Sequence, residues 1–371
     1  MKRPTIRSLT PLVGVAALAA CGAPQQAPQG GSIPVHAGDA ECRLDRTEAP
    51  AGTVTFDITN TGGQVTEFYL YGPGDRIVGE VENIGPGMTQ QLVAQVPEGG
   101  QYQAACKPGM QGNGIRTPFT VTGRAGGPDS VTRAATDEYR RYVTEQAAEL
   151  TKGTEEFAAA VRAGDVPRAQ ALYPQARQPW ERIEPVAESF EDLDPQIDGR
   201  PDDLEPGQPF TGYHRLEQDL WQRGLQPDSA AVADQLVKQV GEVAEKAPAT
   251  QFDAAKVANG AKELLDEVAT KKISGEEEAF SHTDLWDFKA NVDGARRVVD
   301  SLRPVLQQRD PQLLSDVDQR FAAVNGLLDQ LRTGGGFRTY DQVPPERTKE
   351  LAAAVDALGE PVSKIAGVVA G

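Results

Sequence analysis

Two pairs of side chains in the C-terminal two thirds of the chain have the spacing of metal ligands. Glu181 and Glu184 are three residues apart, and so are His214 and Glu217. Residues at this spacing lie on one face of a helix, so each pair can point at a single ion. Glu276–Glu278 adds a third acidic segment. The alternative is that these charged pairs lie on solvated helix faces, where such spacing is common.

The chemistry that such a set of residues favours is the binding of iron. Helical bundles hold iron or manganese with carboxylate and imidazole groups that converge from neighbouring helices. Hard oxygen donors with few nitrogens and no thiolate favour Fe³⁺ or Fe²⁺ over copper(I) or structural zinc. A zinc peptidase helix of the HExxH type, with two histidines and a general-base glutamate, is absent from the sequence.

The segments that must position these side chains are expected to be helical. Residues 129–371 are rich in Ala, Leu, Glu, Gln and Arg with a 3.6-residue periodicity, which predicts an all-α bundle without strands. Asp129 or Ser130 can cap the first helix, and Pro174 and Pro304 are expected to mark breaks or kinks. The expected helices run from 130 to beyond 150 and over 166–190, 211–224, 229–246, 252–273, 283–308, 311–332 and 345–368.

The preceding residues 33–123 have the pattern of a β-sandwich. Thr53–Thr59 alternates apolar and polar side chains with a period of two, and Asn60–Gly63 supplies a turn. Short strands separated by Gly, Pro and Asn are typical of a sandwich. The further strands are expected at Val65–Tyr71, Ile77–Val81, Thr89–Val96, Gln101–Cys106 and Ile115–Val121.

The N-terminus has the pattern of an export signal. Residues 1–20 combine a basic start with the short apolar run Pro11–Ala20, which is too short to span a bilayer. Small residues before Cys21 resemble the lipobox of bacterial lipoproteins, in which the cysteine is lipidated. Residues 21–32 then form a Pro-, Gln- and Gly-rich tether. We expect an exported protein that is held at the bacterial cell membrane by lipid only and faces the periplasm or the cell exterior.

The charge balance excludes other partners. The 371 residues include 54 acidic and 37 basic side chains, for a formal net charge of −17. Nucleic-acid binding needs clustered Lys and Arg, so the composition argues against it, and it equally disfavours a polybasic membrane-surface protein.

Several motifs in this chain resemble a known family. Phe210–Glu217 is similar to the HxxE signature of the imelysin-like proteins, once classed as metallopeptidases. Ile273–Glu278, Ser281–Phe288 and Glu184–Asp194 resemble the EfeO branch of that family. The resemblance covers nearly all of the chain after Cys21. It implies an N-terminal cupredoxin-like domain followed by an imelysin-like domain, as the periodicity also predicts.

The resemblance implies an extracytoplasmic iron-binding protein. It would work with an EfeU-type permease and an EfeB-type haem peroxidase in iron uptake, and it would not be an enzyme, apart from an accessory ferroxidase step. Tyr213, Arg215 and Asp219 are candidates for residues that orient ligands. The ligand candidates that match the family motifs are Glu181, Glu184, Asp198, His214, Glu217 and Glu277, with Glu276 and Glu278 competing with Glu277.

The β-domain allows two interpretations. A blue-copper centre needs two histidines, and His36 is the single histidine of this domain. Cys42 and Cys106 suit a disulfide in an oxidising compartment. The resemblance also permits a second metal site, for copper or zinc, in which these two cysteines act with Glu67 or Glu82.

Two other functions remain as alternatives. The first is a metallopeptidase, despite the missing HExxH helix. The second is a surface lipoprotein that binds haem or a polymer. Haem would need an axial ligand, and His282 is the spare histidine of the helical domain.

Overall fold

Alternation of buried and more exposed side chains is clear in the long N-terminal strand β4 (Gly52–Asn60). The computed structural model describes residues 31–201, 204 and 207–370. Val54, Phe56 and Ile58 of β4 are buried, so one face of the strand points into a core. The other strands are β1 (Ile33–Ala37), β2 (Cys42–Leu44), β3 (Glu48–Pro50), β5 (Thr66–Tyr71), β6 (Ile77–Ile84), β7 (Thr89–Val96), β8 (Glu98–Pro108) and β9 (Ile115–Arg124).

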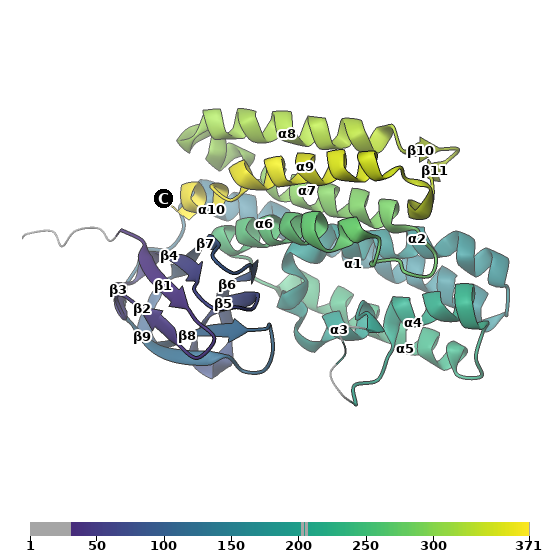
Figure 1. Ribbon diagram of the computed structural model, residues 1–371, viewed down its shortest axis with the longest axis horizontal. Coiled ribbons are helices and arrows are strands. Elements are labelled where there is room, and N and C mark those ends of the chain that lie inside the picture. Colours follow the sequence, from purple (N-terminus) through teal and green to yellow (C-terminus); the bar gives the residue numbers. More distant parts are fainter. Residues whose placement is uncertain (1–30, 202–203, 205–206, 371) are drawn as a thin grey trace, which may run out of the picture. The chain divides into compact units, whose positions relative to one another are not determined.

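These strands make two sheets that enclose the core (Figure 1). One has the order β2-β1-β4-β7 and the other the order β3-β9-β8-β5-β6. Between them the ring centroid of Phe56 lies 5.2 Å from that of Phe68 and 5.4 Å from that of Phe119. The predicted β-sandwich is confirmed. The short strands β1, β2 and β3 were not individually expected, because three to five residues are too few for a clear alternation.

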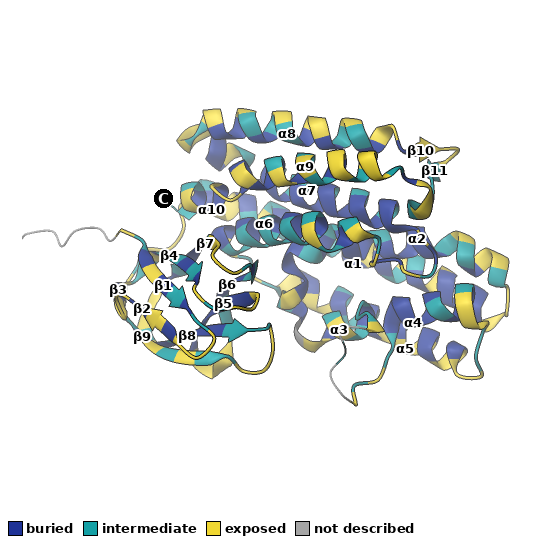
Figure 2. Cartoon of the chain, viewed as in Figure 1, coloured by how far each residue is buried: buried dark blue, intermediate teal, exposed yellow. Residues whose placement is uncertain are grey.

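The remainder of the described chain is predominantly helical, as predicted, and each long helix buries one side (Figure 2). The first helix, α1 (Ser130–Arg162), is capped by Asp129, whose side chain accepts a hydrogen bond from the Thr132 N–H at 2.7 Å. The other helices are α2 (Val166–Ile183), α3 (Asp194–Ile197), α4 (Gly212–Gln218), α5 (Ser229–Lys246), α6 (Ala254–Thr270), α7 (Asp284–Arg309), α8 (Pro311–Asp329), α9 (Pro345–Val362) and α10 (Ile365–Ala370).

The helix expected over 166–190 ends early, at Ile183. Pro185 has no N–H to donate to the Glu181 carbonyl four residues before it. The side chain of Asn291 donates to that carbonyl instead, at 3.1 Å. The chain continues as the 3₁₀ helix η2 (Glu184–Leu193), so Glu181 and Glu184 lie on either side of a change in helix type.

Pro174 and Pro304 do not break their helices: they lie inside α2 and α7, which continue through them. The region expected to lack strands contains a small hairpin, β10 (Arg332–Thr333) and β11 (Gly336–Phe337). Local sequence identifies a proline but not the packing that keeps a helix intact around it.

The β-domain contacts the helical domain through α6, which packs against β6 and β7. The side chain of Asn259 on α6 donates a hydrogen bond to the Val93 carbonyl of β7 at 2.7 Å. The side chain of Gln95 on β7 donates a hydrogen bond to the carbonyl of Ala370, near the C-terminus, at 3.2 Å. Residues from Ser32 onward therefore form one compact unit.

The export signal, Cys21 and residues 21–30 of the tether lie outside the described residues. Within the part of the chain that is described, every helix is too short or too polar to cross a membrane.

Candidate metal centre

The candidate ligands come from five segments that converge beside α2. Glu181 lies on α2 and Glu184 at the start of η2. Asp198 directly follows α3, His214 and Glu217 lie on α4, and Glu277 lies in the segment before α7. All six side chains lie in or beside the buried centre of the helical domain, not on solvated faces.

A close approach of two backbones brings α4 to α3. Gly212 begins α4 with φ of +77°, and a Cβ at this position would lie 2.2 Å from the Ile197 carbonyl oxygen. Only glycine fits there without displacing the chain. The approach places His214 Nε2 3.5 Å from Asp198 Oδ1.

A lysine, Lys272, lies among three of the candidate carboxylates. Lys272 Nζ is 3.1 Å from Glu181 Oε2, 2.8 Å from Glu184 Oε1 and 3.3 Å from Glu277 Oε1. The side chain of Asn291 adds a hydrogen bond to Glu181 Oε2 at 2.9 Å. One ammonium group therefore contacts three of the six candidate ligands.

An arginine, Arg177, lies among a set of carboxylates that partly overlaps with the set around Lys272. Arg177 is fully buried and hydrogen-bonds to Glu181. Its guanidinium nitrogens also lie 3.1 Å from Asp198 Oδ1 and 3.2 Å from Glu277 Oε1. Further contacts reach Glu278 at 2.9 Å and Asp287 at 3.1 Å. Since a buried cation needs such partners, Arg177 fixes the positions of carboxylates from several elements.

His214 links two groups of potential ligands. Atoms of Asp198, His214 and Glu277 lie within 4.8 Å of one another, and so do atoms of His214, Glu217 and Glu278. Glu217 Oε1 already accepts hydrogen bonds from two backbone N–H groups, those of Phe280 and Ser281, at 2.9 and 2.7 Å. Glu217 thus holds the loop before α7 and has less freedom to bind an ion.

The three consecutive glutamates differ in position. Glu277 and Glu278 are buried and Glu276 is exposed. Both buried glutamates contact Arg177, but Glu277 also contacts Lys272, whereas Glu278 accepts hydrogen bonds from Tyr173 and Ser281 on the Glu217 side.

Burial and neighbouring charge act in opposite directions on these carboxylates. Burial alone would raise each pKa, but Lys272 and Arg177 hold the pKa of Glu181 well below its usual range. Lys272 and Arg200 likewise lower the pKa of Glu277 to about 2. For Glu184, burial exceeds the effect of Lys272 and its pKa is raised. Asp198 behaves in the same way beside Arg177. These two carboxylates therefore take up protons more readily than free carboxylates do, and protons compete with an ion for them.

One carboxylate oxygen of the cluster has no hydrogen-bond donor. Asp198 Oδ1 is buried and accepts no hydrogen bond of good geometry, although it lies near Arg177 and His214. A buried acceptor without a donor is costly for the folded protein. Together with three other carboxylates it offers the hard oxygen donors that suit iron.

The site opens onto a cavity of about 350 Å³. Glu184, Asp198 and Glu277 line this cavity, as does Lys272, whereas His214 and Glu217 do not. Three of the six ligand candidates therefore line the cavity, and the other three, Glu181, His214 and Glu217, do not.

The three residues expected to orient ligands have other contacts. The Tyr213 hydroxyl lies 2.6 Å from Thr154 Oγ1. Arg215 contacts Asp219 at 3.2 Å, and Asp219 accepts a hydrogen bond from Ser229 at 2.7 Å. These contacts hold α4 and the segment after it against α1 and α5, and the ring centroid of Tyr213 lies 5.8 Å from the guanidinium carbon of Arg177. His282, considered for haem, is exposed.

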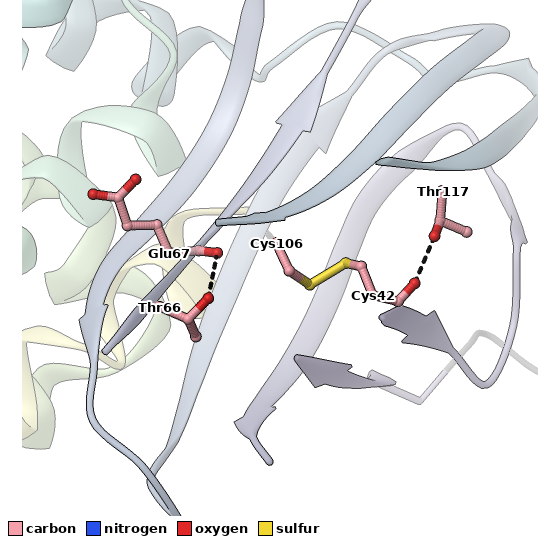
Figure 3. The surroundings of a disulfide bond; sticks show 5 residues. All are labelled: Cys42, Thr66, Glu67, Cys106 and Thr117. Atoms are coloured by element: carbon pink, nitrogen blue, oxygen red, sulfur yellow. Dashed lines mark hydrogen bonds between the residues drawn. A yellow bond between two sulfur atoms is a disulfide. The ribbon is translucent and has the colours of Figure 1, made fainter. Parts of the chain in front are cut away.

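The four β-domain candidates come from both sheets: Cys42 lies on β2 of one sheet, and Cys106, Glu67 and Glu82 lie on strands of the other. Cys42 and Cys106 form a disulfide inside the sandwich. Glu67 points away from it (Figure 3), and the Tyr69 hydroxyl lies 3.1 Å from Glu67 Oε2 and 3.0 Å from Glu82 Oε1. The structure therefore does not bring the cysteines and the two glutamates together, because alternate residues of a strand point to opposite faces.

Sequence reasoning missed the cations and amide of the site. Arg177 lies four residues before Glu181 on the same helix, a spacing that could have indicated the pairing. Lys272 and Asn291 gave no such signal, since they are 91 and 110 residues from Glu181.

Comparisons with known proteins agree with this architecture. Residues 135–365 match the imelysin family, and residues 11–121 match the cupredoxin-like domain. Iron uptake system component EfeO of Escherichia coli strain K12 is 38% identical over 340 residues, which cover 89% of each chain. EfeO of Shigella flexneri has the same identity and coverage.

A likeness to one solved structure concerns the β-domain. Reduced auracyanin from Roseiflexus castenholzii is 20% identical and covers 25% of this chain and 97% of that chain, with a TM-score of 0.22. A score this low adds nothing to the fold assignment. The matches to the imelysin family and to EfeO confirm the resemblance seen in the sequence motifs. The chain therefore belongs to the imelysin family, in the EfeO branch of iron uptake components that joins a cupredoxin-like domain to an imelysin domain.

Proposed function

We propose that this protein captures iron outside the cytoplasmic membrane and passes it to a membrane permease. The observation that carries the proposal is the buried group of carboxylates from several elements, three of which line one cavity. The relatives' role in iron uptake agrees with it.

The donor set suits iron as cargo rather than as a permanent cofactor. Carboxylate oxygens bind Fe³⁺ strongly and lose it when they are protonated. Glu184 and Asp198, whose pKa values burial raises, would be the first to take up protons. The site can therefore hold the ion and still release it.

We assign the iron ligands to the side of the cluster that reaches the cavity. These are Glu184, Asp198 and Glu277, which line the cavity, and Glu181, which contacts the same Lys272 ammonium as Glu184 and Glu277. His214 lies 3.5 Å from Asp198 and completes the set or supports it from behind. Glu217 is assigned a structural role because two backbone N–H groups occupy one of its oxygens.

The remaining parts of the proposal concern the setting of the protein. Residues 1–20 would direct export and Cys21 would carry the lipid anchor. An EfeU-type permease would receive the iron, and an EfeB-type haem peroxidase would act in the same system. No peptidase role is proposed, since both ring nitrogens of His214 face charged side chains of the protein.

A matched pair of neighbouring glutamates tests the assignment. Calorimetric titration of the purified protein with Fe³⁺ citrate should show at least 100-fold weaker binding for Glu277→Gln than for the wild type. Glu276→Gln changes an exposed residue next to it and should bind as the wild type does. Equal affinities for the two variants would refute the assigned site.

A second comparison separates the two halves of the cluster. Glu181→Gln with Glu184→Gln should abolish iron uptake in the same titration. His214→Ala should weaken it less. If His214→Ala abolishes binding and the glutamate variant retains it, the iron lies on the α4 side and the ligand assignment is wrong.

A further inference from the structure

A buried glutamate on the β-domain lines the same cavity. Glu80 on β6 is 5% exposed, and its Oε2 accepts no hydrogen bond within the described residues. No described basic side chain forms an ion pair with it within 4 Å. Glu80 lines the cavity of about 350 Å³ together with residues of the helical domain. The hydrogen-bonding neighbour of this carboxyl is another acid, Glu188. Burying acids together without a cation is unfavourable, so a bound cation would offset their charge.

Two more carboxylates approach Glu80 from the helical domain. Glu188 extends from η2 and Glu263 from α6, and both line the cavity. Burial raises the pKa of Glu80, and the charges of Glu188 and Glu263 raise it further. Three acidic side chains from three elements and two domains thus point into one space.

The cations around this group have other contacts or lie further away. Lys256 also lines the cavity and lowers the pKa of Glu80 only in part. Lys262 forms an ion pair with Asp266 on its own helix. Lys272 and Arg200 contact Glu277. In all, ten carboxylates and four basic side chains line the cavity, so its walls carry an excess of negative charge.

We propose that Glu80, Glu188 and Glu263 form a second cation site at the contact between the two domains. The ligand class is a hard cation that prefers oxygen donors, such as Mn²⁺, Ca²⁺ or Fe³⁺. The site is separate from the six candidate ligands described above and stands whether or not those bind iron. Because its ligands come from both domains, a bound ion offsets their mutual repulsion and ties β6 to α6 and η2.

The test counts bound Mn²⁺ by electron paramagnetic resonance, in which the signal of the free ion disappears on binding. The wild type should show two classes of site at pH near 7.5. Glu80→Gln with Glu263→Gln should lose one class or weaken it at least tenfold. Glu181→Gln with Glu184→Gln should affect the other class only. Glu41→Gln, an exposed change on the β-domain, serves as the control and should bind like the wild type.

The two proposals can fail separately. If the Glu80 and Glu263 variant keeps both classes at wild-type affinity, the second site is refuted. If the Glu181 and Glu184 variant keeps both classes, the iron site is wrong and the second site stands. If Glu80 and Glu188 only share a proton, Mn²⁺ will show no class that depends on them, and this also overturns the proposal.

A milder variant guards against misfolding. Should the Glu80 and Glu263 variant lose its circular dichroism spectrum, Glu188→Gln replaces it, since Glu188 is exposed and its amide form should fold. This variant should weaken the same class of Mn²⁺ binding at least tenfold. Unchanged binding in Glu188→Gln would overturn the assignment.

Discussion

At the scale of single residues, the centre is defined as much by its cations as by its carboxylates. Lys272 contacts Glu181, Glu184 and Glu277, three residues assigned to iron. Arg177 contacts Glu181, Asp198 and Glu277. These two side chains neutralise a group of acids that could not otherwise be buried together. An ion at the proposed site would compete with the Lys272 ammonium for the same oxygens.

Replacing this lysine should separate stability from affinity. In Lys272→Met the metal-free protein loses the partner of three buried acids, and we expect a loss of roughly 3–5 kcal/mol of unfolding free energy. The affinity for Fe³⁺ should rise at least tenfold, because the competing ammonium is gone. Denaturant titration and calorimetry measure the two effects.

The control for this lysine is Lys349→Met, which changes an exposed residue of α9 and should alter neither property. Iron affinity in Lys272→Met that is equal to or weaker than that of the wild type would show that Lys272 supports the ion instead of competing with it.

At the scale of elements, the position of η2 depends on how closely α6 approaches it. A Cβ on Gly260 of α6 would lie 2.0 Å from the Pro185 carbonyl oxygen. Glu184 and Glu188, each assigned to one of the two proposed sites, lie on η2 on either side of Pro185. The packing of one glycine therefore affects both sites.

Gly260→Ala should push α6 and η2 apart. We expect a loss of about 1–3 kcal/mol in unfolding free energy, as in overpacked cores, together with weaker iron binding. Gly241→Ala is the matched control, since no atom lies within 4 Å of a Cβ added there in α5. That change should stabilise the protein by roughly 0.5–1 kcal/mol. Equal effects of the two substitutions would contradict the close approach.

The disulfide links two elements of the sandwich, β2 and β8, across 64 residues. By the chain-entropy relation, closing a loop of this length stabilises the folded state by roughly 4 kcal/mol. Cys42→Ala with Cys106→Ala should therefore unfold at a clearly lower denaturant concentration. In protein that lacks Cys21, a thiol titration under denaturing conditions should find no free thiol, and two reactive thiols would contradict the disulfide.

At the scale of the whole molecule, acidic groups of the two domains face each other and make stability depend on pH. Burial and the charges of Glu67 and Glu188 raise the pKa of Glu82 to about 7, from an ordinary value of 4.5. The Tyr69 hydroxyl contacts both Glu67 and Glu82 but has one proton to donate. A proton on one of the two carboxyls completes the second hydrogen bond.

The sign of the pH effect follows from the raised pKa. Between the two values the folded state binds the proton that the unfolded chain has lost, so this stabilisation is fully present below pH 4.5 and is lost as the pH rises through about 7. In EDTA, the melting temperature should fall between about pH 5 and about pH 8, and Glu82→Gln should reduce the fall. Glu48→Gln, on the exposed surface of β3, should not. Parallel pH profiles for the wild type and Glu82→Gln would contradict the assignment.

Much of the architecture could be predicted from the sequence because it depends on local pattern. The period-two segment around Phe56 and the 3.6-residue periodicity after Asp129 specified the two types of domain. Helix ends were less predictable: α2 ends at Ile183, where Pro185 has no N–H for the Glu181 carbonyl and Asn291, far along the chain, donates to that carbonyl instead. The same limit applies to Pro174 and Pro304, which lie inside intact helices.

By itself, the sequence of this protein determined its inventory: a β-domain, a helical domain, the family motifs and six candidate donors. Only the tertiary structure decided which donors meet. It placed three of the donors at the cavity and three away from it. It also inserted Lys272 between Glu181 and Glu277 and brought Glu80 to the same cavity as Glu188. The physical reason is that burial and counter-charge arise from contacts between residues far apart in the chain, and no local spacing encodes them.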